Sequence, residues 1–91
     1  MEAEFQADFK RYAPQFKAEN VKFYKGNLAE ADQIDDLWKR LTTEHGPIHM
    51  LINNAAVCFG RKFLDQPLHL FKLSMDINFM AYVHLTRRFL E

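Results

Sequence analysis

A short and almost wholly apolar run between two helical patterns limits most strongly what this chain can fold into. Residues 48–52, Ile-His-Met-Leu-Ile, are interrupted only by His49 and directly follow Gly46-Pro47. A run of this length after a Gly-Pro break is too short for a helix and is typical of a parallel strand that is buried on both faces. Because such a strand needs helices on both sides of its sheet, the run predicts an α/β fold.

Helical periodicity lies on both sides of this predicted strand. Before it, a helix over residues 30–44 is indicated by apolar residues at helical spacing, Ile34, Leu37, Trp38 and Leu41, and Gly46-Pro47 is its stop signal. After it, Pro67 opens a helix over residues 68–90. One face of that helix carries Leu68, Phe71, Met75, Phe79 and Tyr82, and a second carries Leu70, Leu73, Ile77, Met80, Ala81 and Leu85. A helix that is apolar on two sides needs two packing partners.

The first twenty-five residues add one more helix and one more strand. The helix is indicated by Phe5, Phe9, Tyr12, Ala13 and Phe16, and Pro14 should end or kink it near Tyr12. Val21 to Tyr24 is a short β-prone run that Gly26 and Asn27 stop. The order is therefore α-β-α-β-α without an internal repeat, which predicts one doubly wound α/β domain over residues 1–91.

Charge and cysteine content exclude several classes of protein. Twelve basic and twelve acidic residues cancel, and the basic pairs at 39–40 and 87–88 are too short for a nucleic-acid footprint, so no nucleic-acid partner is expected. The single Cys58 forms no internal disulfide, and no Cys or His spacing predicts a metal site. An acidic start without a signal peptide and apolar runs too short to cross a membrane favour a cytoplasmic location and no membrane span.

Two motifs resemble the classical short-chain dehydrogenase/reductase family. They are Leu-Ile-Asn-Asn-Ala-Ala-Val at residues 51–57 and Met-Asp-Ile-Asn-Phe at residues 75–79, and the resemblance extends over nearly the whole chain. It implies a partial Rossmann-type doubly wound fold in which the two predicted strands are strands three and four of the parent sheet. It also implies an incomplete NAD(P)-binding domain over residues 1–91, with NAD or NADP as the cofactor.

The first motif is the expected cofactor-binding segment. In the family a strand with this ending runs alongside the dinucleotide, so the resemblance implies that role for Asn53, Asn54, Ala55 and Ala56. Ligands in open α/β sheets bind outside the carboxyl ends of the strands, and two small alanines let the backbone approach a ribose closely. The alternative is that the two asparagines only turn the chain.

Two further sites follow from the same resemblance. Asn27 and Leu28 match the end of the third strand, where the family uses an Asp and an aliphatic residue to hold adenine; an Asn amide still accepts a hydrogen bond. Asn27 as a simple turn residue is the alternative. Asn78 matches the Asn of the catalytic set Asn-Ser-Tyr-Lys, which sits at a helix break whose freed backbone holds a water in a proton relay. Asparagine is a poor helix former, and an Asn in a subunit contact is the alternative.

The chain lacks the family's other functional parts. It has no glycine-rich loop, and none of Tyr12, Tyr24 and Tyr82 is followed four residues later by Lys. In the doubly wound order 3-2-1-4-5-6, strands three and four are not neighbours, and at about 4.8 Å per step they stand roughly 14 Å apart. We therefore expect the isolated chain to be inactive and marginal or molten.

Three functional hypotheses follow. The first is a fragment of an NAD(P)-dependent oxidoreductase that acts on a small-molecule alcohol or carbonyl; residues 63–67, 78 and 85–90 are similar to retinol and 17β-hydroxysteroid dehydrogenases with lipophilic substrates. The second is an interaction module that docks through helix 68–90 onto a full-length relative, as a homo- or hetero-oligomer. The third is an unrelated small α/β binding protein, in which the two strands would pair directly with each other.

Overall fold

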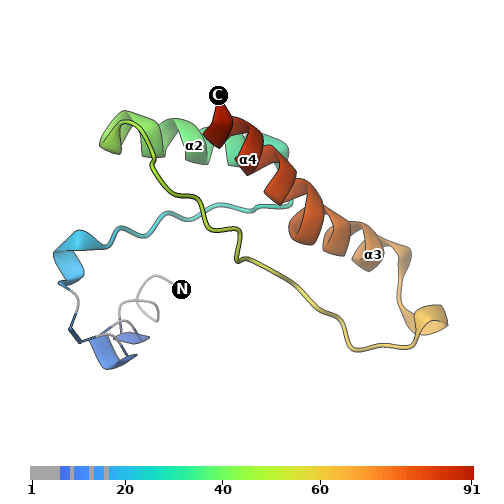
Figure 1. Ribbon diagram of the computed structural model, residues 1–91. Coiled ribbons are helices and arrows are strands. Elements are labelled where there is room, and N and C mark those ends of the chain that lie inside the picture. The colour runs from blue at the N-terminus through green and yellow to red at the C-terminus, as the bar shows by residue number, and fades with distance from the viewer. Residues whose placement is uncertain (1–6, 9, 13, 16) are drawn as a thin grey trace.

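A computed structural model describes residues 7–8, 10–12, 14–15 and 17–91 of the chain. Its elements in chain order are η1 (Ala18–Asn20), α2 (Ala31–His45), η2 (Phe63–Asp65), α3 (Leu68–Met75), the π-helical turn η3 (Asp76–Met80) and α4 (Ala81–Leu90) (Figure 1). Residues 7–8 and 10–12 are helical. The rest of the apolar stripe predicted for this first helix, Phe5, Phe9, Ala13 and Phe16, lies outside the described residues.

Helix α2 confirms the helix predicted over residues 30–44. It ends where the Gly-Pro signal places the stop: Gly46 has φ 72°, a left-handed conformation that glycine adopts without strain, and its N–H donates to the Thr42 carbonyl. Ile34, the first apolar residue of the predicted stripe, is buried, so the periodicity also identified the face that packs.

Elements α3, η3 and α4 follow one another without a break as one long helical unit, which confirms the helix predicted over residues 68–90 (Figure 1). The π-helical turn adds a residue to one turn and so rotates every later position by about 100° relative to an unbroken α-helix. The apolar faces read from the sequence are consequently not continuous in space. Leu68 is 84% exposed and Phe79 is 53% exposed, whereas Ala81 is buried.

The two predicted strands are not formed, and the doubly wound sheet expected from the sequence is therefore absent from the described part of the chain. Residues 21–24 and 48–52 are not in β-strands, and both lie in long stretches that run as extended chain in Figure 1. A strand exists only when a neighbour accepts and donates its backbone hydrogen bonds, and these two runs do not pair with each other. The third hypothesis, an unrelated α/β protein, required the two strands to pair directly with each other. The structure does not show that pairing.

Side chains of α2 hold the first extended segment instead. Lys22 Nζ lies 3.5 Å from Glu44 Oε1, and Arg40 Nη2 donates to the Lys25 carbonyl at 3.1 Å. The Tyr24 hydroxyl donates to Glu44, and it lies 2.7 Å from His45 Nε2. The hydrogen bond with Glu44 is the main cause that raises the pKa of Tyr24 to about 12, and the same bond lowers the pKa of Glu44.

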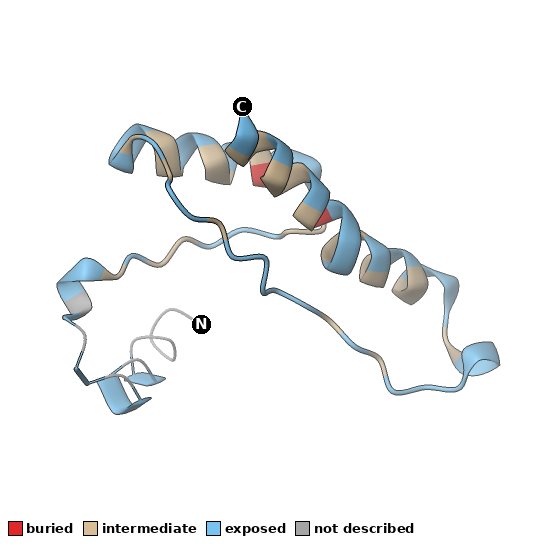
Figure 2. Cartoon of the chain, in the orientation of Figure 1, coloured by how far each residue is buried: buried red, intermediate tan, exposed pale blue. Residues whose placement is uncertain are grey.

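Helices α2 and α4 pack against each other and supply the buried apolar residues of the described part. Ile34 of α2 is 2% exposed and Ala81 of α4 is 1% exposed, and Figure 2 shows these buried positions where the two helices meet. Further along the same contact the rings of Trp38 and Phe89 meet edge to face, with centroids 6.5 Å apart.

An ionic cluster spans the same pair of helices. Asp35 Oδ1 on α2 accepts from Arg88 Nε at 2.9 Å and lies 2.7 Å from Arg88 Nη2 and 2.8 Å from His84 Nε2, both on α4. Arg88 Nη1 also donates to Glu91 at 3.2 Å. This cluster, the Asp35 cluster, fixes the rotation of α4 relative to α2 because a single carboxylate oxygen binds two side chains that lie one helical turn apart.

The chain as a whole is expanded. Its radius of gyration is 15.7 Å, against about 12 Å for a compact domain of this length. Its accessible surface is 7512 Å², against roughly 5,500 Å² for a compact protein of this mass. Large apolar side chains such as Met50 and Ile52, each about three-quarters exposed, account for part of the excess. The expected marginal stability stays a prediction.

The Asp35 cluster should give the contact between α2 and α4 a defined dependence on pH. Hydrogen bonds from Arg88 and then from His84 hold the pKa of Asp35 below its ordinary value of 3.8. A depressed carboxylate pKa contributes stability that is present above the unfolded-state pKa and is lost as the pH falls through the folded-state pKa. We expect Trp38 fluorescence to report loosening of the contact below about pH 3.8, and Asp35→Asn to remove this acid step. Glu91→Gln should retain the step, and an unchanged step in Asp35→Asn would contradict the assignment.

Candidate functional site

Segment 53–57 is attached to the long helical unit at regular intervals. The three links are Asn53 to Thr86, Ala55 to Tyr82, and Val57 to Asn78. Two residues of extended chain advance about 6.6 Å, and four residues of α-helix advance about 6 Å, so every second residue of the segment meets every fourth residue of the helix. The segment therefore runs antiparallel to the helix in a matched register.

The Asn78 side chain makes the two hydrogen bonds with the Val57 backbone that a neighbouring strand would make. The Val57 N–H donates to Asn78 Oδ1 at 2.9 Å, and Asn78 Nδ2 donates to the Val57 carbonyl at 2.8 Å. Asn78 lies in the π-helical turn η3, where the Ala81 N–H reaches back to the Asp76 carbonyl. Such turns occur often at functional sites. Asparagine is a poor helix former, and its presence at position 78 is explained by these two hydrogen bonds: the Asn78 amide pairs with the Val57 backbone groups, which have no neighbouring strand.

Tyr82 and Thr86 form the other two links, and sequence reasoning missed both. The Tyr82 hydroxyl donates to the Ala55 carbonyl, and Asn53 Nδ2 donates to Thr86 Oγ1 at 3.2 Å. A signal was present, since Asn78, Tyr82 and Thr86 are hydrogen-bonding residues spaced four apart, which places them on one side of the helix. What the sequence lacked was a reason to place segment 53–57 opposite that row.

Asn54 and Ala56 are the members of the predicted cofactor segment that no link holds. Both are exposed, and the Asn54 side chain makes no hydrogen bond with any described residue. An amide offers two donors and an acceptor oxygen, which match the hydroxyls of a ribose, and the methyl groups of Ala55 and Ala56 leave room for it. The exposed amide and its small neighbours fit one edge of a dinucleotide.

Asn27 and Leu28 lie elsewhere on the helix pair. Asn27 Oδ1 accepts from the Ala29 N–H at 3.0 Å, and the Asn27 N–H donates to Gln33 Oε1 at 2.9 Å, so Asn27 shapes the turn into α2. Leu28 lines a groove between α2 and the unit formed by η3 and α4. The predicted adenine contact therefore remains a prediction, and the turn role that we considered as its alternative is present.

Other candidate chemistry is limited. Within the described ranges no three His, Cys, Asp or Glu side chains gather as a metal site would require. Cys58 is free and exposed. Over the same part of the chain, no helix has both the length and the apolar character to cross a bilayer.

Known proteins similar to the chain were found at the level of sequence. The family model described as short chain dehydrogenase matches residues 3–91. Epidermal retinol dehydrogenase 2 of Mus musculus is 33% identical over 73 residues, which cover 80% of this chain and 24% of that protein. Retinol dehydrogenase 10-B of Danio rerio is 33% identical over 77% of this chain and 21% of its own length.

A relative of lower sequence identity is named for a different kind of substrate. The 2-dehydro-3-deoxy-D-gluconate 5-dehydrogenase of Formosa agariphila is 29% identical over 85% of this chain and 31% of its own length. The chain thus spans about a quarter of the length of the mouse and human epidermal retinol dehydrogenases that it matches. No solved structure matches the chain.

Removal of the Asn78 amide should release Val57. In Asn78→Ala the Val57 N–H and carbonyl lose their side-chain partner, and a hydrogen bond of this kind contributes roughly 0.5–1.5 kcal/mol. We expect the Val57 amide to exchange with solvent several-fold faster by NMR, with little change for amides inside α2. Asn54→Ala, which removes an amide without a partner, is the matched control. Equal Val57 exchange in the two variants would contradict the link.

Proposed function

Because the chain belongs to the short chain dehydrogenase family, we propose that it is a segment of an NAD(P)-dependent oxidoreductase. The complete protein would transfer hydride between the nicotinamide and an alcohol or carbonyl carbon of a small molecule. The cofactor, NAD or NADP, supplies the redox chemistry, and the protein binds and orients it. We infer a cytoplasmic location from the lone Cys58 and the absence of cysteine pairs.

The link between Asn78 and Val57 carries this proposal. It fixes the end of segment 53–57 on the helix, and Asn54 and Ala56 are the exposed residues of the segment that none of the three links holds. In this assignment Asn53, Asn54, Ala55 and Ala56 adjoin the cofactor, with Asn53 held in place by Thr86. Asn78 acts at the reaction centre through the π-helical turn that contains it. Asn27 and Leu28 are assigned to the adenine end.

The names of the relatives support a substrate class. Two of the three relatives described above are named retinol dehydrogenases, and retinol is a lipophilic alcohol. The third is named for a sugar acid. We assign this chain to the lipophilic group because its identity to the retinol dehydrogenases is the higher of the two.

We further propose that these 91 residues are inactive alone. They contain neither a glycine-rich loop nor a Tyr-x-x-x-Lys motif, and the backbone of residues 48–52 lacks strand neighbours. A dinucleotide needs its pyrophosphate held at a helix N-terminus after such a loop, and the isolated chain offers no equivalent.

The second candidate function is an interaction module that docks onto a full-length relative through residues 68–90. The observation in its favour is the exposure of large apolar side chains along this helical unit: Leu68, Met75, Phe79, Met80, Val83 and Leu90. Exposed large apolar side chains that lie along one helical unit favour a protein contact.

A chimaera tests the oxidoreductase assignment. We expect that mouse epidermal retinol dehydrogenase 2 with its matching segment replaced by this chain keeps retinol-dependent reduction of NAD or NADP, whereas the isolated chain has none in the same assay. Asn78→Ala in the chimaera should lower kcat by about a hundredfold, the scale expected when the reacting groups are displaced by a fraction of their separation. Ser74→Ala, one helical turn earlier, is the control. A chimaera whose activity survives Asn78→Ala would refute the role of Asn78.

Gel filtration tests the second candidate. When the chain is mixed at micromolar concentration with the Formosa dehydrogenase, docking through residues 68–90 would give a co-eluting complex. Met75→Glu combined with Phe79→Glu should abolish it, because both side chains are more than half exposed and would bring charge into an apolar contact. Leu64→Glu, at an apolar side chain that is 92% exposed but lies outside this helix, should have no effect. Separate elution of the unmodified proteins excludes this function.

A further inference from the structure

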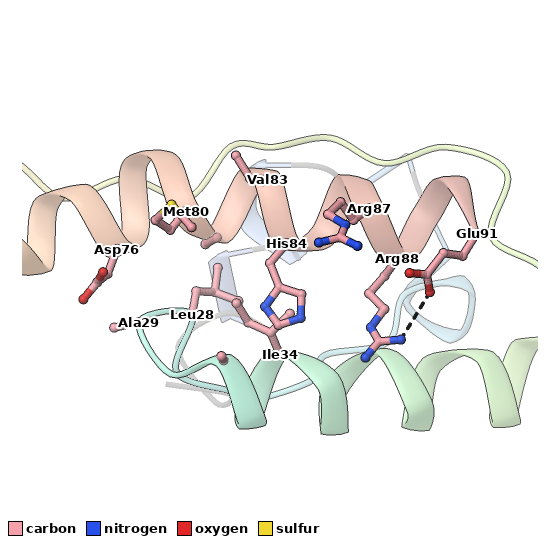
Figure 3. A pocket seen from close by; sticks show the side chains of 12 residues that line it. Leu28, Ala29, Ile34, Asp76, Met80, Val83, His84, Arg87, Arg88 and Glu91 are labelled. Atoms are coloured by element: carbon pink, nitrogen blue, oxygen red, sulfur yellow. Dashed lines mark hydrogen bonds and ion pairs between the residues drawn. The ribbon is translucent and has the colours of Figure 1, made fainter.

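A groove between α2 and the helical unit of η3 and α4 is separate from segment 53–57. Its volume is about 480 Å³, which lies within the range of small-molecule sites. Its apolar lining includes Leu28, Ile34, Met80, Ala81 and Val83. Figure 3 shows Leu28 and Ile34 between the two helices, and Met80 and Val83 on the helical unit of η3 and α4. None of Asn53, Asn54, Ala55 and Ala56 lines it.

The charged side chains along the groove are paired, with one exception. The pairs are Asp76 with Lys72 at 2.5 Å, His84 with Asp35 at 2.8 Å, and Arg88 with Asp35 at 2.7 Å and with Glu91 at 3.2 Å. Arg87 lines the same groove, and its guanidinium makes no hydrogen bond or ion pair with any residue that the structure describes. Figure 3 shows its guanidinium on the α4 side, between His84 and Arg88. The groove therefore offers one guanidinium for a ligand.

The positions of Arg87 and Asp76 along the helix limit the charge that a ligand of the groove can carry. Arg87 and Asp76 are eleven residues apart, about 16 Å along the helix axis, with Met80 and Val83 between them. A ligand with its anionic end at Arg87 would place its other end near the Asp76 carboxylate, which disfavours a second negative charge. One free cation also does not match the two phosphates of a dinucleotide.

We propose that this groove binds an amphipathic monoanion, an aliphatic carboxylate whose chain lies over Leu28, Met80 and Val83 and whose head group pairs with Arg87. The planar guanidinium suits bidentate binding of a carboxylate. The apolar chain gains by covering side chains that are now open to water, since Met80 is 50% exposed and Val83 is 38% exposed. This site does not depend on the proposed oxidoreductase function.

The test uses the full 91-residue chain and decanoate as the probe. We expect saturable binding by calorimetry at or below the order of 1 mM, with NMR shifts confined to the methyl groups of Leu28, Ile34 and Val83. Arg87→Gln should weaken binding about tenfold, the scale of one charge-assisted hydrogen-bonded pair. Arg61→Gln, at an exposed arginine outside the groove, should bind as the unmodified chain does.

Two further measurements separate the head group from the apolar chain. Decyltrimethylammonium, which carries the opposite charge on a chain of the same length, should bind at least about tenfold more weakly than decanoate. Val83→Asp, at a partly exposed position, should weaken decanoate binding by repulsion while circular dichroism stays unchanged. Equal binding by Arg87→Gln and the unmodified chain, equal binding of the two amphiphiles, or no saturable binding of decanoate would each overturn the proposal.

Discussion

Backbone N–H and C=O groups need hydrogen-bond partners, and an extended segment without neighbouring strands has to find them elsewhere. Segment 53–57 finds them on a helix: Asn78 serves both polar groups of Val57, and Tyr82 serves the carbonyl of Ala55. The matching advance of two extended residues and four helical residues makes this arrangement repeat. Segment 53–57 is thus positioned by side chains of one helix, although the sequence predicted a sheet.

That helix is useful as a support only because α2 holds it. Buried Ile34 and Ala81 and the ring contact of Trp38 with Phe89 supply the apolar part of the packing, and Asp35 with Arg88 and His84 sets the rotation of α4. The two kinds of contact differ in what they contribute. Burial of apolar surface tolerates small rotations about the helix axis, whereas a carboxylate that binds two side chains one turn apart does not. The face of α4 that meets segment 53–57 therefore depends on an ionic cluster on a neighbouring face.

The sequence predicted the helices well and the sheet badly, because helices depend on residues close together in the sequence and sheets depend on residues far apart. Helical periodicity and the Gly46 stop are local, so helices over 30–44 and 68–90 were recoverable from residues a few positions apart. A strand at 48–52 is an apolar run whose structure depends on distant neighbours. The Asp35 cluster joins residues about fifty positions apart, and nothing local in a helix face marks which carboxylate will meet which arginine. Tyr82 and Thr86 were missed for the same reason.

The position of Asn78 constrains what it can do chemically. Its amide oxygen and nitrogen both face Val57, so a side chain used in this way is poorly placed to exchange protons with a substrate at the same time. An influence on the reaction would then run through the backbone of the π-helical turn, or through the position of the segment that Asn78 holds. Both routes require an amide at residue 78, because a carboxylate would accept from the Val57 N–H but repel its carbonyl. Asn78 is in this respect a positioning residue first, and its chemistry follows from the geometry that it maintains.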